Sequence, residues 1–539
     1  MPLLRPNVPP PPHYYADNLL RLLREVSRQY NDILLETERD YLQRAFALSV
    51  GALRLYARLL TRKGPLIRID SLRYHEISDV SAALAELESA ALVRCGPPLP
   101  ADRFLAMLTR VELRALFPHA HAPLKDQLID TIAARYPDHW IRDTVERSHR
   151  LCVALGAEKL SIMQLLFFGE SRAGLSTFVL EDLGMLRFEA YTLDPRHRQF
   201  HDRLELDDYL GMLALREQLR MLDTRWQHAL AVDALDALWR FRERRALERV
   251  RGGLVNHLGR SAERARDYDL ALSAYGRASR APGRERRARL LRRLGDQDGV
   301  RLSLDAIERA PVSGGEGFFA RQFRAARRSS VAHYPAERIL RLPGPPGREG
   351  VEAAALAALT RDGGDGRHLE NLAPLGMLGL AFWDVIFAPV DGAFVNPYQV
   401  RPLDLYWNDF RRARSAAIDA RFAELAQPCA LLRAVCATSR AKHGISNALV
   451  DWRALDAQFV RRAVRCVPSP VWLAIFDHML DDLEQTRTGF PDLTLLFGRG
   501  RFQFVEVKGP GDQLRREQRL WFEFFAKAGI DAFVQRIQW

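Results

Sequence analysis

The sequence predicts a multidomain, mainly helical protein that ends in a small α/β domain. At 539 residues the chain is long enough for several packed domains. Apolar and charged residues recur at helical spacing through most of the chain, whereas two short β-rich runs flank a Gly-Arg-Gly turn at 498–500. Hydrophobic residues make up 47% of the chain, which predicts folded domains rather than disorder.

The charge balance and the cysteines narrow the class of protein. Lys and Arg (79) exceed Asp and Glu (67), and the pI is near 9.7, so the charge favours a polyanionic partner. Five cysteines without a CxxC pair indicate a reducing compartment and exclude the usual zinc-finger spacings. The N-terminus has no apolar core of secretory type. Residues 371–390 are long enough to span a membrane but contain Pro, Gly and Asp, so we expect a core helix and no membrane partner.

Residues 1–100 predict a proline-rich arm followed by a winged-helix-like domain. Helical spacing near 14–63 gives way to a short strand at 64–69 and then to a helix that runs through Leu84 and Leu87 to Leu92 and Val93. A generic helical scaffold fits the same spacing. Basic residues in this region would contact the DNA backbone rather than its bases; they are Arg58, Arg62, Lys63, Arg68 and Arg73.

Residues 101–140 predict a pair of DNA-binding helices of the SAP type. Two apolar helical runs flank a turn rich in Pro and His, and Lys125 begins the second run. Thr109 and Glu112 have the spacing of a capping box, in which each side chain bonds to the other residue's backbone N–H. We expect Lys125 to contact DNA phosphates.

Residues 141–345 predict a helical linker and a domain that resembles tetratricopeptide repeats. One repeat is clear, and it consists of Leu258, Gly259, Tyr268, Ala271, Tyr275, Ala278 and Pro282. A single repeat cannot bury its apolar face, so neighbouring helices must complete the stack, which could also bind a protein partner. Paired Pro and Gly residues at 342–350 predict a linker, so the last domain should cover 351–539.

The last domain contains a predicted β-hairpin that brings two acids together. If a three-residue loop pairs Phe497 with Arg501, Asp492 lies opposite Glu506, and Lys508 shares their face. Opposed carboxylates repel unless a cation lies between them, and Mg²⁺ prefers such oxygen ligands. A surface hairpin whose acids are solvated or paired with Lys508 fits the pattern too, because a one-residue shift in register would separate the acids.

Short sequence motifs in this domain, which contain the acids and Lys508, also resemble those of a known family. Pro491-Asp492 followed by Glu506-Val507-Lys508 is similar to the PD-(D/E)xK nuclease signature. The continuation through Asp512, Gln518 and Trp521 resembles the VRR-NUC branch. Glu370 and the apolar run that ends at 382–387 are similar to the Fanconi-associated structure-specific nucleases. The resemblance implies a C-terminal α/β PD-(D/E)xK nuclease domain.

That resemblance assigns expected roles to individual residues. Glu370, Asp492, Glu506 and the backbone carbonyl of Val507 would bind Mg²⁺ or Mn²⁺. Lys508 would hold the attacking water or balance the phosphate charge. Gln518 would point toward the site from a helix expected at 513–528, with Trp521 in the core. A continuous helix would hold Asp384 about 21 Å from Glu370, which leaves Asp384 a buried pairing role.

The resemblance also implies a substrate and a setting. Family members cut branched double-stranded DNA near a 5′ flap, trim 5′ ends and serve the repair of interstrand crosslinks. The sequence lacks the zinc-finger spacing of eukaryotic relatives, so it resembles a bacterial form and is expected in the cytoplasm. Two alternatives stay open. One is a Holliday-junction resolvase or another endonuclease on the same fold, and the other is a non-enzymatic repair scaffold.

Overall fold

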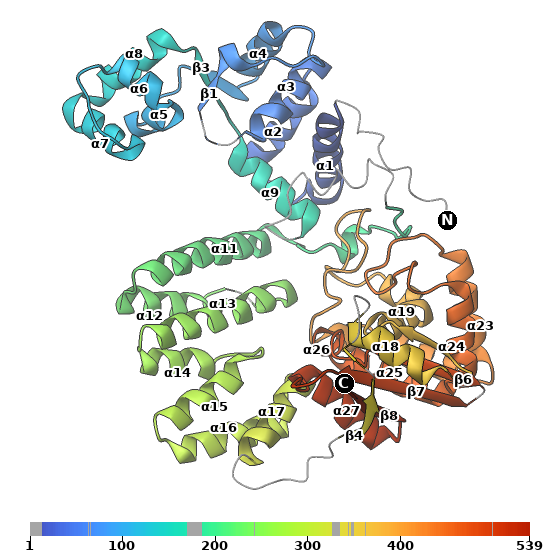
Figure 1. Ribbon diagram of the computed structural model, residues 1–539. Coiled ribbons are helices and arrows are strands. Elements are labelled where there is room, and N and C mark those ends of the chain that lie inside the picture. The colour runs from blue at the N-terminus through green and yellow to red at the C-terminus, as the bar shows by residue number, and fades with distance from the viewer. Residues whose placement is uncertain are drawn as a thin grey trace. The chain divides into compact units, whose positions relative to one another are not determined.

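The computed structural model describes residues 13–62, 64, 66–169, 186–241, 243–325, 335–342, 344–345, 350–361, 363–498 and 500–539. These residues form two compact units, Met1–Leu186 and Arg187–Trp539, each taken by itself below (Figure 1). The expected arm at 1–12 and Lys63 lie outside the described residues.

The first unit begins with four helices that pack with a small sheet. The helices are α1 (Tyr14–Tyr30), α2 (Glu36–Phe46), α3 (Val50–Leu60) and α4 (Val80–Ser89). The sheet has the order β1-β3-β2 and is antiparallel, with β1 at Leu66–Arg68, β2 at Val93–Cys95 and β3 at Leu151–Ala154. The predicted order of helix, strand and helix is confirmed, but the second helix ends at Ser89 and Val93, expected at its end, begins β2. The third strand comes from beyond residue 140, so the expected boundaries at 100 and 140 do not coincide with the limits of this fold.

A four-helix insertion separates β2 from β3. It consists of α5 (Ala101–Met107), α6 (Arg110–Leu116), α7 (Lys125–Arg135) and α8 (Asp138–Ser148), which enclose their own apolar core. The predicted capping box is confirmed at the start of α6, because the Thr109 N–H donates to Glu112 Oε2 at 2.7 Å and the Glu112 N–H donates to Thr109 Oγ1 at 3.3 Å. After β3 the chain continues into α9 (Ala157–Phe168).

The second unit opens with a stack of helices in which sequence neighbours pack against each other (Figure 1). They are α11 (Arg203–Thr224), α12 (His228–Ala237), α13 (Arg245–Arg264), α14 (Tyr268–Gly276), α15 (Gly283–Arg293), α16 (Gln297–Arg309) and α17 (Gly314–Ala325). The repeat-like residues lie between α13 and α14. A Cβ at Gly259 would lie 2.5 Å from the ring of Tyr275, so only Gly allows these two helices to approach. This contact explains the glycine in the pattern.

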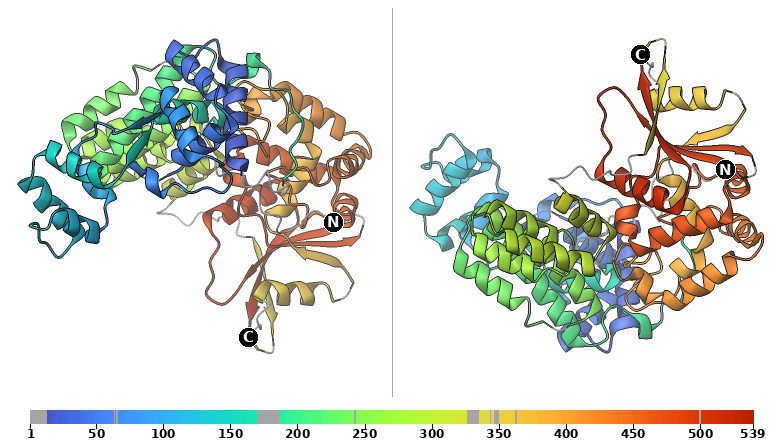
Figure 2. Two further views of the ribbon diagram at one scale, coloured as in Figure 1. Left: turned by 90° about the horizontal axis from the view of Figure 1, so that it is seen from above. Right: turned by 90° about the horizontal axis from the view of Figure 1, so that it is seen from below.

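A five-stranded sheet of order β4-β8-β7-β6-β5 forms the centre of the C-terminal domain. Its strands are β4 (Ala336–Arg341), β5 (Asp365–His368), β6 (Leu493–Gly498), β7 (Arg501–Lys508) and β8 (Ala532–Gln538). The β4–β8 and β7–β8 pairs are parallel, and the other two are antiparallel. Figure 2 shows α18 (Gly350–Leu359) on one side of the sheet and α27 (Arg516–Ala528) on the other.

Strand β4 moves the start of this domain upstream of the expected linker. It precedes residues 342–350 and pairs with β8 in register, Ala336 with Phe533 through Arg341 with Gln538. The strand is an edge and is almost wholly exposed, so it carries no alternation of apolar and polar residues that could reveal it. The sheet therefore begins near residue 336 rather than at 351.

The hairpin register agrees with the prediction except at its turn. Leu493 pairs with Val505, and the same register continues to Leu496 and Phe502, as predicted. A bulge then pairs Gly498 with Arg501, so the predicted pairing of Phe497 with Arg501 is wrong. Alternation along β7 directs Val505 and Val507 to the α18 side and Phe504 to the α27 side.

The helices between β5 and β6 build a large apolar core against the α27 side of the sheet. They are α19 (Leu372–Ala381), α20 (Trp383–Ile386), α21 (Phe410–Ala413), α22 (Ser415–Leu425), α23 (Ala430–Ala441), α24 (Ala457–Cys466), α25 (Ser469–Asp481) and α26 (Leu483–Thr486). A break at Phe382 shows that the expected continuous helix is wrong. Asp384 pairs with Arg421 as expected, but its side chain is exposed rather than buried. Among the described residues, the helices all fall short of the length and apolarity needed to cross a membrane.

Helix α27 contacts the helical stack through its first residue. The Arg516 guanidinium donates to Glu285 Oε1 on α15 at 2.8 Å and to the carbonyl of Gly315 at 2.5 Å. The Glu285 side chain is only 2% exposed, so its charge depends on this partner and on Arg289. The contact fixes the start of α27 relative to α15 and α17.

We expect Glu285 and Arg516 to stabilise the fold cooperatively. Glu285→Gln and Arg516→Gln should each lower the unfolding temperature. The double variant should lose less free energy of unfolding than the two single variants together, with a coupling free energy of about 1 to 3 kcal/mol. Thermal unfolding of the full chain in a double-mutant cycle measures this coupling. Arg519→Gln, on the exposed side of the same helix, is the matched control. Additive losses of free energy of unfolding would show that Glu285 and Arg516 do not stabilise the fold cooperatively.

Candidate active site

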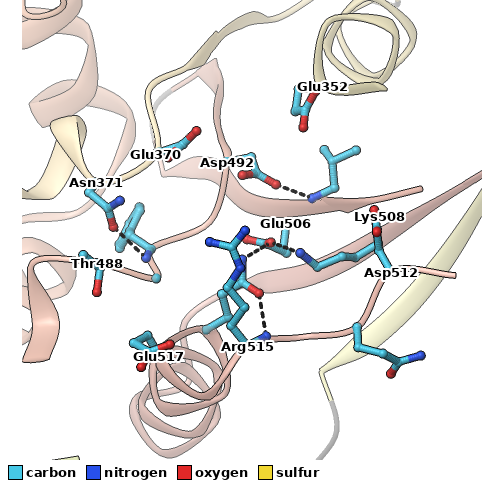
Figure 3. Close-up of a pocket in the computed structure, with 15 residues that line it drawn as sticks. Glu352, Glu370, Asn371, Thr488, Asp492, Glu506, Lys508, Asp512, Arg515 and Glu517 are labelled. Atoms are coloured by element: carbon cyan, nitrogen blue, oxygen red, sulfur yellow. Dashed lines mark hydrogen bonds and ion pairs between the residues drawn. The ribbon is translucent and has the colours of Figure 1, made fainter. Parts of the chain in front are cut away.

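The predicted acids converge on one cavity of about 550 Å³ beside the end of β7. Glu370, Asp492 and Glu506 line it, and Lys508 and Gln518 line it too (Figure 3). They come from the turn after β5, the start of β6, strand β7 and the first turn of α27. Three separate stretches of sequence therefore supply the acids of a single site.

Glu506 is the most constrained of these acids. It is completely buried, and its Oε1 accepts hydrogen bonds from Lys508 Nζ at 2.7 Å and from Gln518 Nε2. Its other oxygen, Oε2, is buried and has no hydrogen-bond partner among the described residues. Burial and the nearby Asp492 carboxylate raise the pKa of Glu506 to about 7, although Lys508 opposes this rise.

Asp492 is held by the backbone of β7 and in turn holds Glu370. Its Oδ2 accepts the Val507 N–H at 2.7 Å, and its carbonyl accepts the N–H groups of Leu369 and Glu370, both at 3.1 Å. Burial raises the pKa of Asp492, while the Val507 N–H and Lys508 oppose that rise. Glu370 has a φ of 46°, a conformation that L-residues rarely adopt, and two backbone hydrogen bonds at this turn support it.

The residues that the sequence analysis missed include His368, which lies beside Glu370 and Asp492, and Glu352, which lines the cavity. His368 Nε2 lies 3.3 Å from Glu370 Oε1, and one ligand atom from each of His368, Glu370 and Asp492 lies within 4.8 Å of the others. Glu352 comes from the first turn of α18. A lone histidine two residues before an acid has no distinctive spacing. An acid such as Glu352 is common in the first turn of a helix, where it interacts favourably with the helix dipole.

Gln518 is fixed at both ends of its amide. Its Oε1 accepts the Arg515 N–H at 2.9 Å in a capping box, which leaves Nε2 to donate to Glu506. Gly489, with a φ of 89°, lets the loop before Asp492 pack on this turn, because a Cβ there would lie 2.6 Å from the Glu517 carbonyl carbon. Trp521 is buried as predicted, and its Nε1 donates to the carbonyl of Thr488 at 3.1 Å.

The donor set fits a divalent cation. Carboxylates dominate the cavity, and hard cations such as Mg²⁺ and Mn²⁺ take carboxylate oxygens. A buried, unpartnered Glu506 Oε2 would otherwise carry an uncompensated desolvation penalty, which a cation relieves.

The basic residues expected to contact DNA have different surroundings in the first unit. Arg62 and Arg73 are exposed, and Arg62 donates to the Tyr74 hydroxyl at 3.0 Å. Lys125 is half-buried and donates to the carbonyl of Ala106 at 2.9 Å. Arg68 instead forms a bidentate ion pair with Glu112, at 2.5 and 2.8 Å, which already balances its charge.

Removing the Glu506 charge should stabilise the metal-free protein. A pKa raised to about 7 means that the folded state resists ionisation of Glu506. The free energy of unfolding therefore falls as the pH rises from the pKa of this group in the unfolded chain toward 7. With EDTA present at pH 8, Glu506→Gln should unfold at a higher temperature than the parent, because its free energy of unfolding should be higher by about 1 to 3 kcal/mol. This difference in free energy should shrink at pH 5. Thermal unfolding at both pH values tests this. A lower unfolding temperature for the variant at pH 8 would contradict it.

Two family models and several relatives match the chain. The VRR-NUC domain model matches residues 428–539, and the model named FAN1, HTH domain matches residues 13–94. The Fanconi-associated nuclease 1 homolog of Pseudomonas aeruginosa is 29% identical, over 98% of this chain and 96% of its own length. Fanconi-associated nuclease 1 of Homo sapiens is 25% identical, over 97% of this chain and 62% of its own length.

Solved structures agree over the whole chain. The crystal structure of paFAN1 bound to 2nt 5′ flap DNA with gap superposes with a TM-score of 0.83 at 27% identity, and covers 99% of both chains. The structure with a 1nt 5′ flap gives a TM-score of 0.81 over 98% of this chain and 99% of that one. With the acid cluster of the sheet, these matches show that the chain belongs to the Fanconi-associated nuclease family and carries a VRR-NUC domain.

Proposed function

We propose that this protein is a metal-dependent phosphodiesterase that cuts branched DNA near a 5′ flap, trims 5′ ends and acts in the repair of interstrand crosslinks. The observation that carries the proposal is the convergence of Glu370, Asp492 and Glu506 with Lys508 in one cavity. The flap preference is supported by the likeness to paFAN1, which is bound to 5′ flap DNA in its crystal structures.

Glu370, Asp492, Glu506 and the Val507 carbonyl would hold a Mg²⁺ or Mn²⁺ ion. When bound, the ion orients the scissile phosphate, stabilises its developing charge and lowers the pKa of a bound water. Glu506 would use Oε2, because its Oε1 is already engaged by Lys508 and Gln518. The Val507 N–H holds Oδ2 of Asp492 and so sets the direction of its free oxygen.

Lys508 would act directly on the substrate. Its Nζ lies 2.7 Å from Glu506 Oε1 and its side chain is 11% exposed, so a desolvated ammonium sits at the wall of the cavity. A positive charge there would hold the attacking water or balance the charge on the phosphate oxygens. Charge interactions are stronger in such a half-closed site than in bulk water.

DNA recognition would fall to the first unit. The exposed Arg62 and Arg73 and the half-buried Lys125 would contact phosphates there, together with Lys63. Arg68 would contribute less, since Glu112 already neutralises it. The tetratricopeptide-like stack from α11 to α17 would bind a protein partner. A repair role places the protein with genomic DNA, which in a bacterium lies in the cytoplasm.

Asp492→Ala and Lys508→Ala should each abolish cleavage and leave DNA binding largely intact. Asp492→Ala removes a ligand from the ion, and Lys508→Ala removes the ammonium beside the phosphate, so each should lower the rate by about 100-fold or more. Cleavage of a labelled 5′ flap measures the rate, and fluorescence anisotropy in Ca²⁺ measures binding. Matched controls are Asp531→Ala and Lys527→Ala, which remove like charges outside the cavity. Full cleavage by both site variants would show that this cavity is not the active site, whereas a non-enzymatic repair scaffold predicts that the parent protein does not cleave and that both variants keep every activity of the parent.

The parent protein should cut a 5′ flap faster than a four-way junction of the same arm sequences. The expectation follows from the likeness to structures that hold a flap rather than a junction. Initial rates under single-turnover conditions, with Mg²⁺ and then with Mn²⁺, give the ratio. A ratio of one, or a preference for the junction, would favour the resolvase reading.

A further inference from the structure

A histidine lies beside two of the acids that line the cavity, Glu370 and Asp492. His368 ends strand β5, where it pairs with Leu493, the residue directly after Asp492. Beyond this pair the ladder continues as the Leu369 N–H donates to the Asp492 carbonyl at 3.1 Å. Strand pairing therefore fixes the backbone of His368 against that of Asp492. The backbone that carries the imidazole is therefore part of the sheet rather than of a surface loop.

The side chains of this segment come together in the geometry of a ligand set. One ligand atom from each of His368, Glu370 and Asp492 lies within 4.8 Å of the others. Among the described residues, this is the cluster of His, Cys, Asp and Glu side chains that meets that spacing. Glu506 Oε2, buried and without a partner among the described residues, lines the same cavity and marks it independently as a place for a cation.

An ion pair with Glu370 does not account for this placement. The His368 and Glu370 side chains are 41% and 54% exposed, and their closest atoms are 3.3 Å apart. Exposed pairs of this kind contribute about 0 to 1 kcal/mol, too little to favour a left-handed backbone at Glu370. Binding of one ion by the His368 imidazole and the Glu370 carboxylate would account for a turn that holds the two side chains together.

We propose that His368 binds the divalent cation directly through Nε2, and that this nitrogen makes the site prefer Mn²⁺ to Mg²⁺. The proposal rests on the metal site of the proposed function and adds a ligand to it. Mg²⁺ takes oxygen ligands almost exclusively, whereas neutral imidazole is a common ligand of transition metals. One nitrogen among carboxylates therefore strengthens Mn²⁺ binding more than Mg²⁺ binding.

Pulsed electron paramagnetic resonance of bound Mn²⁺ tests the bond itself. The full-length protein, without DNA and with one equivalent of Mn²⁺, should show ¹⁴N modulation from a coordinated imidazole. His368→Ala should lose that modulation. Labelling the histidines of the unmutated chain with ¹⁵N should replace the ¹⁴N modulation with that of ¹⁵N. His443→Ala, which removes a ring packed on Trp452 in the same domain, is the matched control and should retain it.

Metal titration supplies the second measurement. Calorimetry should show that His368→Ala weakens Mn²⁺ binding by about 10-fold or more, while Mg²⁺ binding changes far less. Bound Mn²⁺ without ¹⁴N modulation in the parent protein would overturn the proposal, and so would equal losses for the two ions. A parent protein that cleaves a 5′ flap yet lacks the modulation would keep the proposed function and reject only this ligand.

Discussion

The buried carboxylate of Glu506 is the constraint on which the site depends. One of its oxygens is held by Lys508 and Gln518, and the other is buried without a partner among the described residues. A half-satisfied buried acid is costly to the fold, and its raised pKa expresses that cost. The fold tolerates this penalty where a cation can compensate it, so the destabilising feature and the chemical function are the same feature.

The surrounding structure serves to hold that acid in place. Gln518 is locked by the cap at Arg515, and Gly489 lets the loop before Asp492 press on the same turn. The neighbouring Arg516 joins that turn to Glu285 and Gly315 of the helical stack. Glu506 is thus linked through Gln518 and the start of α27 to helices that lie more than 200 residues earlier in the sequence.

The Asp492 backbone joins the other half of the site. Its carbonyl accepts two N–H groups from the turn that carries Glu370, while its carboxylate accepts the Val507 N–H. One residue therefore sets the spacing between the turn after β5 and strand β7. Only the bonds from the Asp492 carbonyl to the Glu370 turn are independent of its side chain, whereas the bond to Val507 depends on the carboxylate.

The sequence by itself determined the local features of this protein, and tertiary contacts decided the rest. Alternation was enough for the β6–β7 register from Leu493 and Val505 to Leu496 and Phe502, although not for the bulge at the turn, and helical spacing was enough for α27 and its cap at Gly529. Such features depend on neighbours in sequence, where periodicity is strong. The exposed edge strand β4 and the distant strand β3 depend on partners far along the chain. The approach of His368 and Glu370 to Asp492 depends on the pairing of β5 with β6, which no local pattern records.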